Sequence, residues 1–373
     1  MDKQIIDISK FKQSNDFYDS FTLITTVKSF DLQEIRKRYV ASRKTNKSGK
    51  VGSVERREVG VGGIVKVKID QGKVVSNDIL VKLKEPRGIG ICNDYLGIAA
   101  ENTVYLISDN AVKEINSPWF SYIHTLDFSP HESNKILISS SGLDCIFEYD
   151  TETLTETFSW FAWENGFNEA TDPKTEEKII LTKDAQTAED LKNSNQNVML
   201  IENPIEQVLP TAMRAAFINS VVYDADSPAN ILGTFFHKGA VYKINMNDKQ
   251  VSSALEGLKS PHGGFKLNNE IMATSTATGE VVIGNIDNQK RYIFENLPGK
   301  PDYLDSLEWL QNSKLIGDNI ITIDSNRTSF VIFNPKTELY SMIPYDNNWA
   351  IQDMIVGEIS ESQENNVRSL SSE

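Results

Sequence analysis

The feature that most restricts the fold is a block of fifteen residues that recurs along the chain. Four such blocks superimpose without gaps, at residues 136–150, 231–245, 271–285 and 320–334, and a shorter version occupies 96–109. Each block reads as a strand, a polar or glycine-containing turn, and a second strand with alternating apolar residues, which is typical of a β-hairpin. Further short strands precede and follow the blocks. Four antiparallel strands recurring about every 40 residues are typical of a β-propeller blade.

The repeat predicts an all-β chain with one domain, residues 1–359, folded as a six-bladed β-propeller. Five blades are expected at 86–116, 122–160, 217–258, 260–297 and 303–344, the last with its first strand at 306–310. The segments 20–82 and 349–359 would supply a sixth blade closed by both termini, which leaves no free sheet edge. A pair of β-sandwiches is the alternative fold.

Three segments do not fit the repeat. Residues 161–216 are expected to form a partly helical lid insertion, and residues 34–57 a basic loop with nine Lys or Arg against two Glu. The polar tail, residues 360–373, is expected to be disordered.

Composition excludes several classes of function. The net charge of −14 at pH 7 argues against a nucleic-acid binder, which needs a basic surface. The sequence contains no run of about 18 apolar residues, so no membrane span is predicted. The first residues lack an apolar stretch of signal-peptide length. Cys92 and Cys145 show no metal or redox spacing and fit a reducing compartment. We therefore expect a cytoplasmic monomer or dimer without nucleic acid or membrane as partner.

The predicted topology brings three of the four histidines to one rim of the channel. In a blade whose first strand lines the channel, the links between blades and the turns between second and third strands lie on one face. His124 and His262 begin first strands, His237 lies in a turn between second and third strands, and Asn219 begins a first strand. His131 lies in a link expected on the opposite face.

Histidines gathered at a channel mouth suit two kinds of chemistry. Imidazole nitrogens and an amide can bind a divalent metal and leave a position open for substrate. Neutral imidazole is also the usual general base near neutral pH. The predicted metal ligands are His124, His237, His262 and Asn219, with iron, copper, zinc and calcium undecided. A purely structural, hydrogen-bonding role of the histidines is the alternative.

Other residues complete the predicted site. Arg87 begins a first strand and could bind an anion, so the candidate catalytic residues are Arg87, His124, His237 and His262. A substrate pocket is expected from Trp160, Trp163, Phe217 and Phe236. Carboxylates that could orient these groups are Asp127, Asp305 and Glu308. The basic loop would attract an acidic substrate if it covered the channel, and a solvated loop is the alternative.

Residues 122–285 resemble the arylsulfotransferase-type propellers, six-bladed relatives of the NHL and SMP-30 families. The motifs are HTLDFS from His124, INSVVYD from Ile218 and SPHGGFKL from Ser260. The resemblance implies a channel histidine that accepts a sulfuryl group, supported by other histidines and an arginine, and His124 and His262 match two of the family's histidines. The sequence departs from the family at Phe217, where the family has histidine. It departs again at Phe235 or Phe236, where the family has arginine.

Three functions are consistent with the sequence. The first is an enzyme that acts on a small anionic or aromatic molecule at the channel mouth by hydrolysis, elimination or oxygen chemistry. The second is group transfer through His262, and the third is a non-catalytic propeller that serves as an interaction scaffold. Substituting the rim histidines would abolish turnover in the first two cases and leave the third function intact.

Overall fold

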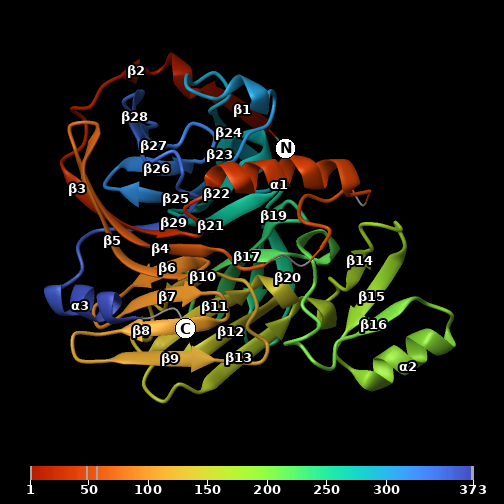
Figure 1. Ribbon diagram of the computed structural model, residues 1–373. Helices are drawn as coiled ribbons and strands as arrows, with labels where there is room; N and C mark the ends of the chain where they lie inside the picture. The colour runs from red at the N-terminus through yellow and green to blue at the C-terminus, as the bar shows by residue number, and fades with distance from the viewer. Residues whose placement is uncertain (1, 48, 56–57, 371–373) are drawn as a thin grey trace.

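Antiparallel hairpins make up most of the structure, a computed structural model that describes residues 2–47, 49–55 and 58–370 (Figure 1). Within these residues, six sheets share one pattern of four antiparallel strands in order from the innermost to the outermost. Five of them are built from consecutive strands: β6 (Pro86–Ile91), β7 (Leu96–Ala100), β8 (Thr103–Ile107) and β9 (Val112–Asn116); β10 (Ile123–Phe128), β11 (Lys135–Ser140), β12 (Cys145–Asp150) and β13 (Glu156–Phe161); β17 (Ile218–Tyr223), β18 (Asn230–Phe235), β19 (Ala240–Asn245) and β20 (Val251–Leu255); β21 (Pro261–Leu267), β22 (Glu270–Ser275), β23 (Glu280–Gly284) and β24 (Asn288–Ile293); β25 (Leu310–Ile316), β26 (Asn319–Asp324), β27 (Ser329–Asn334) and β28 (Leu339–Pro344).

The sixth sheet joins strands from opposite parts of the chain. β29 (Ile351–Val356) pairs with β3 (Phe21–Val27), which is followed by β4 (Val61–Asp70) and β5 (Lys73–Lys84). The innermost strands β6, β10, β17, β21, β25 and β29 pack one against the next, and β29 packs against β6. Each of these six strands therefore packs between two of the others, around a line that we call the axis.

The predicted hairpins are confirmed at all five repeat blocks. The strand expected at 306–310 was wrong, because the innermost strand of that sheet is β25, which begins at Leu310. Its Gln311, Asn312 and Ser313 are buried on the axis. Polar residues there made the sequence look like a loop.

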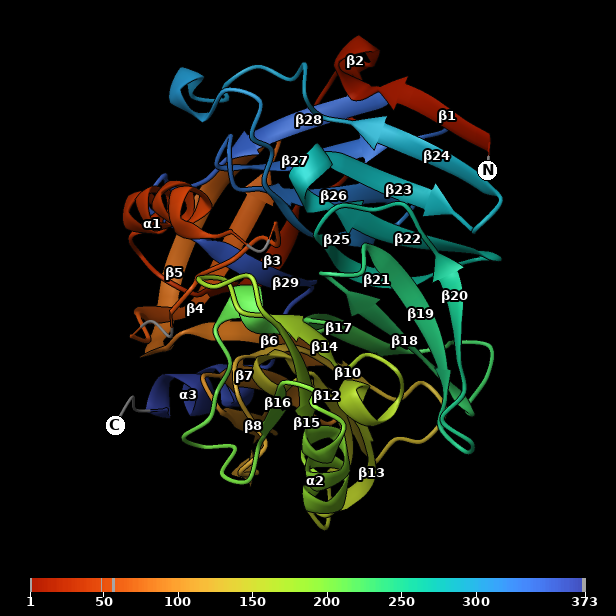
Figure 2. The same cartoon turned by 90° about the vertical axis from the view of Figure 1, so that its right-hand side faces the viewer.

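Two short strands at the N-terminus extend the outer edges of two sheets. β1 (Asp2–Asp7) runs parallel to β24, and β2 (Lys12–Gln13) runs parallel to β28 (Figure 2). The sequence analysis did not predict these strands.

The segment predicted as a basic loop contains a helix, α1 (Leu32–Thr45). The Asp31 side chain caps it by accepting the Glu34 N–H at 2.9 Å. Buried Arg36 fixes it to the sheets, since its Nη2 donates to the carbonyls of Ser325 (2.5 Å) and Asn326 (3.0 Å). The loop prediction failed because charged residues that form helices well also resemble a solvated loop.

The tail predicted to be disordered contains α3 (Glu361–Ser369), which packs against β5 and β8 (Figure 1). Ser360 and Gln363 form a reciprocal capping box at its start, and Val367 is fully buried. The sequence analysis overlooked this S-x-x-Q capping pattern because the tail is polar in composition. The insertion, by contrast, is partly helical as predicted, with α2 (Ala185–Asn193) beside a sheet of β14 (Glu169–Thr171), β15 (Lys178–Thr182) and β16 (Val198–Leu200).

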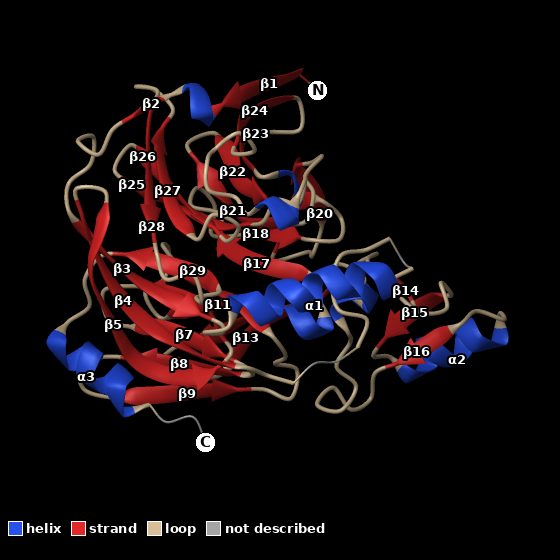
Figure 3. Ribbon diagram, turned by 45° about the horizontal axis from the view of Figure 1, so that its top comes forward, coloured by secondary structure: helices blue, strands red, loops and turns tan. Residues whose placement is uncertain are grey.

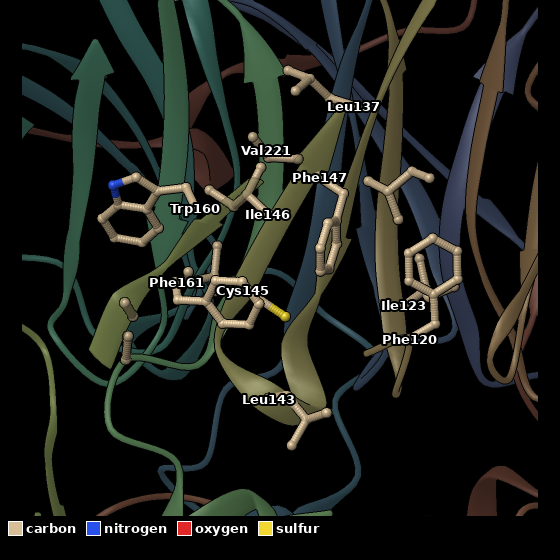
Figure 4. Close-up of a cluster of buried hydrophobic side chains, with 14 of the residues drawn as sticks. Phe120, Ile123, Leu137, Leu143, Cys145, Ile146, Phe147, Trp160, Phe161 and Val221 are labelled. Carbon is tan, nitrogen blue, oxygen red and sulfur yellow. The ribbon is translucent and has the colours of Figure 1, made fainter. Parts of the chain in front are cut away.

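Trp160 belongs to the largest hydrophobic cluster rather than to a pocket. Figure 4 shows its indole among the side chains of β12 and β13, and its ring packs against those of Phe167 and Phe235. No helix in the described part of the chain is long and apolar enough to cross a membrane.

Candidate functional site

A ring of buried polar side chains surrounds the axis. The second residue of every innermost strand is polar and at most 6% exposed, and we call these residues the polar ring: Arg87, His124, Asn219, His262, Gln311 and Gln352. Sequence reasoning singled out four of them. It missed Gln311 because β25 was misplaced, and Gln352 because equivalent positions of the repeat were not compared across all six strands.

Hydrogen bonds fix members of the polar ring to each other and to adjacent backbone. Gln352 Nε2 donates to Gln311 Oε1 at 3.0 Å, and Asn219 Nδ2 donates to the Pro261 carbonyl at 2.8 Å. Because Pro261 directly precedes His262, this bond from Asn219 holds the strand of His262 in place. Arg87 Nη1 donates to His124 Nε2 at 3.2 Å.

A cavity of about 210 Å³ lies at one side of the polar ring. All members of the polar ring except Asn219 line it. The other walls come from α1, the segment after it and the end of the insertion, with Ile35, Arg38, Tyr39, Ser42, Val51, Gly52, Ser53, Thr211 and Arg214. Figure 3 shows α1 in front of the strands, and the Lys47 N–H beyond its end donates to the Pro173 carbonyl of the insertion. Part of the basic segment and the end of the insertion thus cover the cavity.

His124 is held as a neutral imidazole that accepts a hydrogen bond from Arg87. Because the guanidinium can only donate, His124 Nε2 accepts, and Nδ1 donates to the Tyr122 carbonyl at 3.2 Å. Burial, and next the positive charge of Arg87, lower the pKa of His124 well below its ordinary value. The other side of Arg87 is held by Glu85, whose Oε1 accepts from Nη2 at 2.6 Å.

His237 is occupied on both ring nitrogens. Nδ1 lies 2.9 Å from the Arg214 carbonyl and Nε2 lies 3.1 Å from the Val51 carbonyl. Burial lowers its pKa to about 3, so the neutral ring donates to one carbonyl at a time. His237 ties the segment after α1 to the end of the insertion.

His262 differs from the other two because one of its nitrogens has no protein partner. Nδ1 lies 2.7 Å from Thr276 Oγ1. Burial and the charge of Lys28 lower its pKa to about 3, while a hydrogen bond to the Ser260 carbonyl opposes them. The Thr276 hydroxyl can donate to Nδ1 or accept from it. In the described part of the chain no hydrogen bond reaches Nε2, and His262 lines the cavity.

Phenylalanine rings separate the three histidines. The ring of Phe217 lies 5.4 Å from His124 and 5.3 Å from His237, and that of Phe236 lies 5.5 Å from His237 and 5.6 Å from His262, measured between centroids. Both phenylalanines line the cavity, and their role in a substrate pocket stays a prediction.

The described residues do not fit the predicted metal site. Among them, no group of three His, Cys, Asp or Glu could hold a metal ion. The nitrogens of His124 and His237 face protein partners, and Asn219 does not line the cavity. A bound metal stays a prediction that this arrangement does not favour.

The cavity is cationic and aromatic. Lys28, Arg38, Arg87 and Arg214 line it against one carboxylate, Glu308, which is itself paired with Lys300 (2.6 Å) and Arg327 (3.0 Å). The Arg214 guanidinium lies 4.9 Å from the centroid of the Tyr122 ring and 4.8 Å from that of Phe217. Lys28, Tyr122, Arg214 and Trp309 are site residues that sequence reasoning missed.

Asp144 positions the chain segment that carries Arg214 and Phe217. Its Oδ2 accepts the N–H groups of Ala215 (2.8 Å) and Ala216 (3.1 Å), and its Oδ1 accepts that of Phe217 (2.5 Å). Burial raises the pKa of Asp144, and these donors oppose the shift.

Trp163 helps to hold Asp144 in place and does not line the cavity. It is 4% exposed, and its Nε1 donates to Asp144 Oδ2 at 3.4 Å. Of the three predicted orienting carboxylates, Glu308 lines this cavity, whereas Asp305 does not and Asp127 lines a different one.

These sheets define a propeller-like protein of the mostly β class. No protein-family model matches the sequence, and no curated protein shows significant sequence similarity to it. Among solved structures, the chain is similar to a propeller from a nidogen–laminin complex, with TM-score 0.52, 10% identity, and 91% of this chain and 98% of that chain covered. It is also similar to a protein of unknown function from Bacteroides caccae, with TM-score 0.51, 10% identity, and 91% and 100% covered.

A third similar structure is virginiamycin B lyase from Staphylococcus aureus with quinupristin, with TM-score 0.43, 11% identity, and 70% and 71% covered. At these identities the similarity to the nidogen propeller and the Bacteroides protein shows a propeller fold alone. The resemblance to arylsulfotransferase-type propellers stays a prediction.

Proposed function

We propose that the six four-stranded sheets are the blades of one propeller, closed by β29 and β3–β5, and that the cavity beside the polar ring is the active site of an enzyme. The packing of each innermost strand against the next supports the closed ring. The observation that carries the proposal is that His262 lines the cavity and that no hydrogen bond reaches its Nε2 atom within the described residues. We infer that the ring proton lies on Nδ1 and the lone pair on Nε2.

The substrate class follows from the walls of the cavity. Four cationic side chains line the cavity, of which Arg38 is paired with Glu34 and Arg87 with Glu85, and they favour a substrate with an acidic group. The rings of Tyr39, Tyr122, Phe217, Phe236 and Trp309 favour an aromatic or apolar body. We therefore infer a small aromatic or apolar anion.

His262 is the proposed base. A pKa of about 3 makes the imidazole a weak base in the free protein, because burial and the charges of Lys28 and Arg87 disfavour its cation. An anion bound beside these two residues would offset their charge and raise the pKa of His262 toward neutrality. The substrate would thereby activate its own base.

Arg87 is the proposed electrostatic stabiliser. Glu85 and His124 hold its guanidinium on two sides, so little reorganisation is needed when negative charge develops on the substrate. The helix α1 and the segment around Val51 cover the cavity, and the exclusion of water strengthens these interactions.

Group transfer is a second candidate, favoured by the same lone pair. With the ring proton on Nδ1, Nε2 can attack a sulfuryl or phosphoryl ester, and the new N–S or N–P bond forms as the ester bond to the leaving phenolate or alkoxide breaks. An acceptor hydroxyl then takes the group from Nε2 and restores the neutral imidazole, and the proton that the acceptor gives up balances the one that the leaving group takes. This pathway leaves a covalent adduct on His262, which a simple base does not.

The test uses His262→Asn beside His131→Asn. His131 contacts the Asp224 carbonyl at the opposite face, outside the cavity. Both variants and the parent are assayed against aromatic esters, sulfates, phosphates and carboxylates, with peptide mass spectrometry for an adduct on His262. We expect about 100-fold loss of turnover in His262→Asn alone. Turnover that survives in His262→Asn refutes the proposal, and ligand binding without turnover in all three proteins favours the scaffold.

A further inference from the structure

A second cavity, of about 470 Å³, lies on the other side of the polar ring. All six innermost strands line it with residues that come after the ring position, among them Thr125, Asp127, Asn312 and Asp353. The two cavities thus share their strands and are separated by the polar ring. None of the residues proposed for catalysis lines this second cavity.

Asn312 is a buried amide with an unpartnered oxygen at this cavity. Its side chain is 3% exposed, and within the described residues its Oδ1 has no hydrogen-bond partner. A Cβ on Gly263, which also lines the cavity, would lie only 2.8 Å from this oxygen. Because Gly263 has no side chain, it leaves space for the Asn312 amide. A buried acceptor without a donor costs folding free energy.

Asp127 offers a second open acceptor. Its Oδ2 accepts the Tyr223 N–H at 2.8 Å, and in the described part of the chain no hydrogen bond reaches Oδ1. Burial raises the pKa of Asp127 to about 7; the Tyr223 N–H and Lys314 lower it, and Asp353 adds to the rise. The Asp127 carboxylate therefore lines the cavity, and the positive charge near it is too small to offset its burial.

The lysines at this end already lie beside other carboxylates. Lys314 Nζ is 3.7 Å from Asp353 Oδ1, and Lys266 Nζ is 3.4 Å from Asp224 and 2.5 Å from Asp226. Among the described residues none forms an ion pair with Asp127. The remaining walls are largely apolar and include Leu126, Phe128, Val222, Phe265, Leu315 and Met354.

We propose that the second cavity binds a small organic cation, a primary ammonium on an apolar or aromatic body, which donates its N–H groups to Asp127 Oδ1 and Asn312 Oδ1. An ammonium group has donors and no acceptor, which matches two oxygens that only accept. A charge-assisted hydrogen bond to the carboxylate supplies the specificity, and the apolar walls take the body of the ligand. The proposal does not depend on the function assigned to the first cavity.

The test is calorimetric titration of the full chain with benzylammonium at pH 8, where Asp127 is ionised, beside neutral benzyl alcohol and anionic phenylacetate. We expect saturable binding of benzylammonium that is at least about tenfold tighter than that of benzyl alcohol. Asp127→Asn should weaken it at least about tenfold, since the amide oxygen can still accept the Tyr223 N–H while the charge is lost. Asp226→Asn, at the exposed rim of the same face, should leave it unchanged.

Asn312→Ala is the second test variant, and thermal unfolding confirms that each variant folds. If Asp127→Asn does not fold, loss of benzylammonium affinity in Asn312→Ala supports the proposal. Absence of saturable binding in the parent overturns it, as does equal affinity in the parent, Asp127→Asn and Asn312→Ala. Tighter binding of phenylacetate than of benzylammonium also overturns it, because the site would then select anions.

Discussion

Replacing Asp144 by Asn should destabilise the protein through the segment that carries Arg214 and Phe217. The carboxylate accepts three backbone N–H groups, two on Oδ2 and one on Oδ1. If the Asn oxygen keeps the hydrogen bonds from the N–H groups of Ala215 and Ala216, the Asn NH₂ group faces the N–H of Phe217. One charge-assisted hydrogen bond is therefore lost. Such bonds contribute about 1.5–3 kcal/mol. The neutral amide also avoids the cost of burying a charge, so we expect a loss of about 2 kcal/mol.

Urea unfolding at pH 7 measures this loss against Asp184→Asn. The Asp184 carboxylate also accepts a backbone N–H, that of Thr187 at 2.6 Å, but it caps the exposed start of α2. Asn caps a helix as well as Asp does, so this control should change the unfolding free energy by less than about 0.5 kcal/mol. A cost for Asp144→Asn below about 1 kcal/mol, or equal to that of the control, would refute the role given to Asp144.

Three further predictions concern the histidines and α3. Below pH 6.5 an unfolded His262 binds a proton that the folded one, with a pKa of about 3, does not. The parent should therefore lose about 1.4 kcal/mol per pH unit relative to His262→Gln between pH 6 and 4; parallel urea profiles would contradict this. Val367→Ala should cost about 1–2 kcal/mol if α3 packs as described, and an unchanged unfolding midpoint would show that it does not. Elemental analysis of untagged protein should find no stoichiometric transition metal; a stoichiometric metal that disappears in a folded His124→Ala/His262→Ala variant would restore the metal hypothesis.

The hairpins could be predicted from the sequence because their signals are local. Alternating apolar residues and turn residues lie within fifteen positions of each other, and the pairing of β11 with β12 or of β18 with β19 follows them directly. β25 was misplaced because residues on the axis are polar and buried, which reverses the usual pattern. The helices α1 and α3 were missed because their composition is that of solvated segments, while their stability comes from Arg36 and Val367 buried against distant sheets.

The site was predicted in part. The repeat aligned Arg87, His124, Asn219 and His262 at the start of innermost strands, and the structure places all four in the polar ring. Trp160 and Trp163 were assigned to the pocket because they lie close to the insertion in sequence. Both side chains are buried, and neither lines the cavity. Arg214 gave no signal because it lies in the insertion, outside the repeat, and Trp309 was missed because it was assigned to the strand expected at 306–310.

The sequence by itself determined which residues form hairpins, and it placed four of the six polar-ring residues at equivalent positions of the repeat. Only the tertiary structure decided what each histidine does. The Val51 carbonyl that meets His237 is 186 residues away along the chain, and Phe217 and Phe236 separate the imidazoles. Local patterns fix strands and turns, whereas the partner of a ring nitrogen depends on packing between segments whose distance in sequence carries no information about their distance in space.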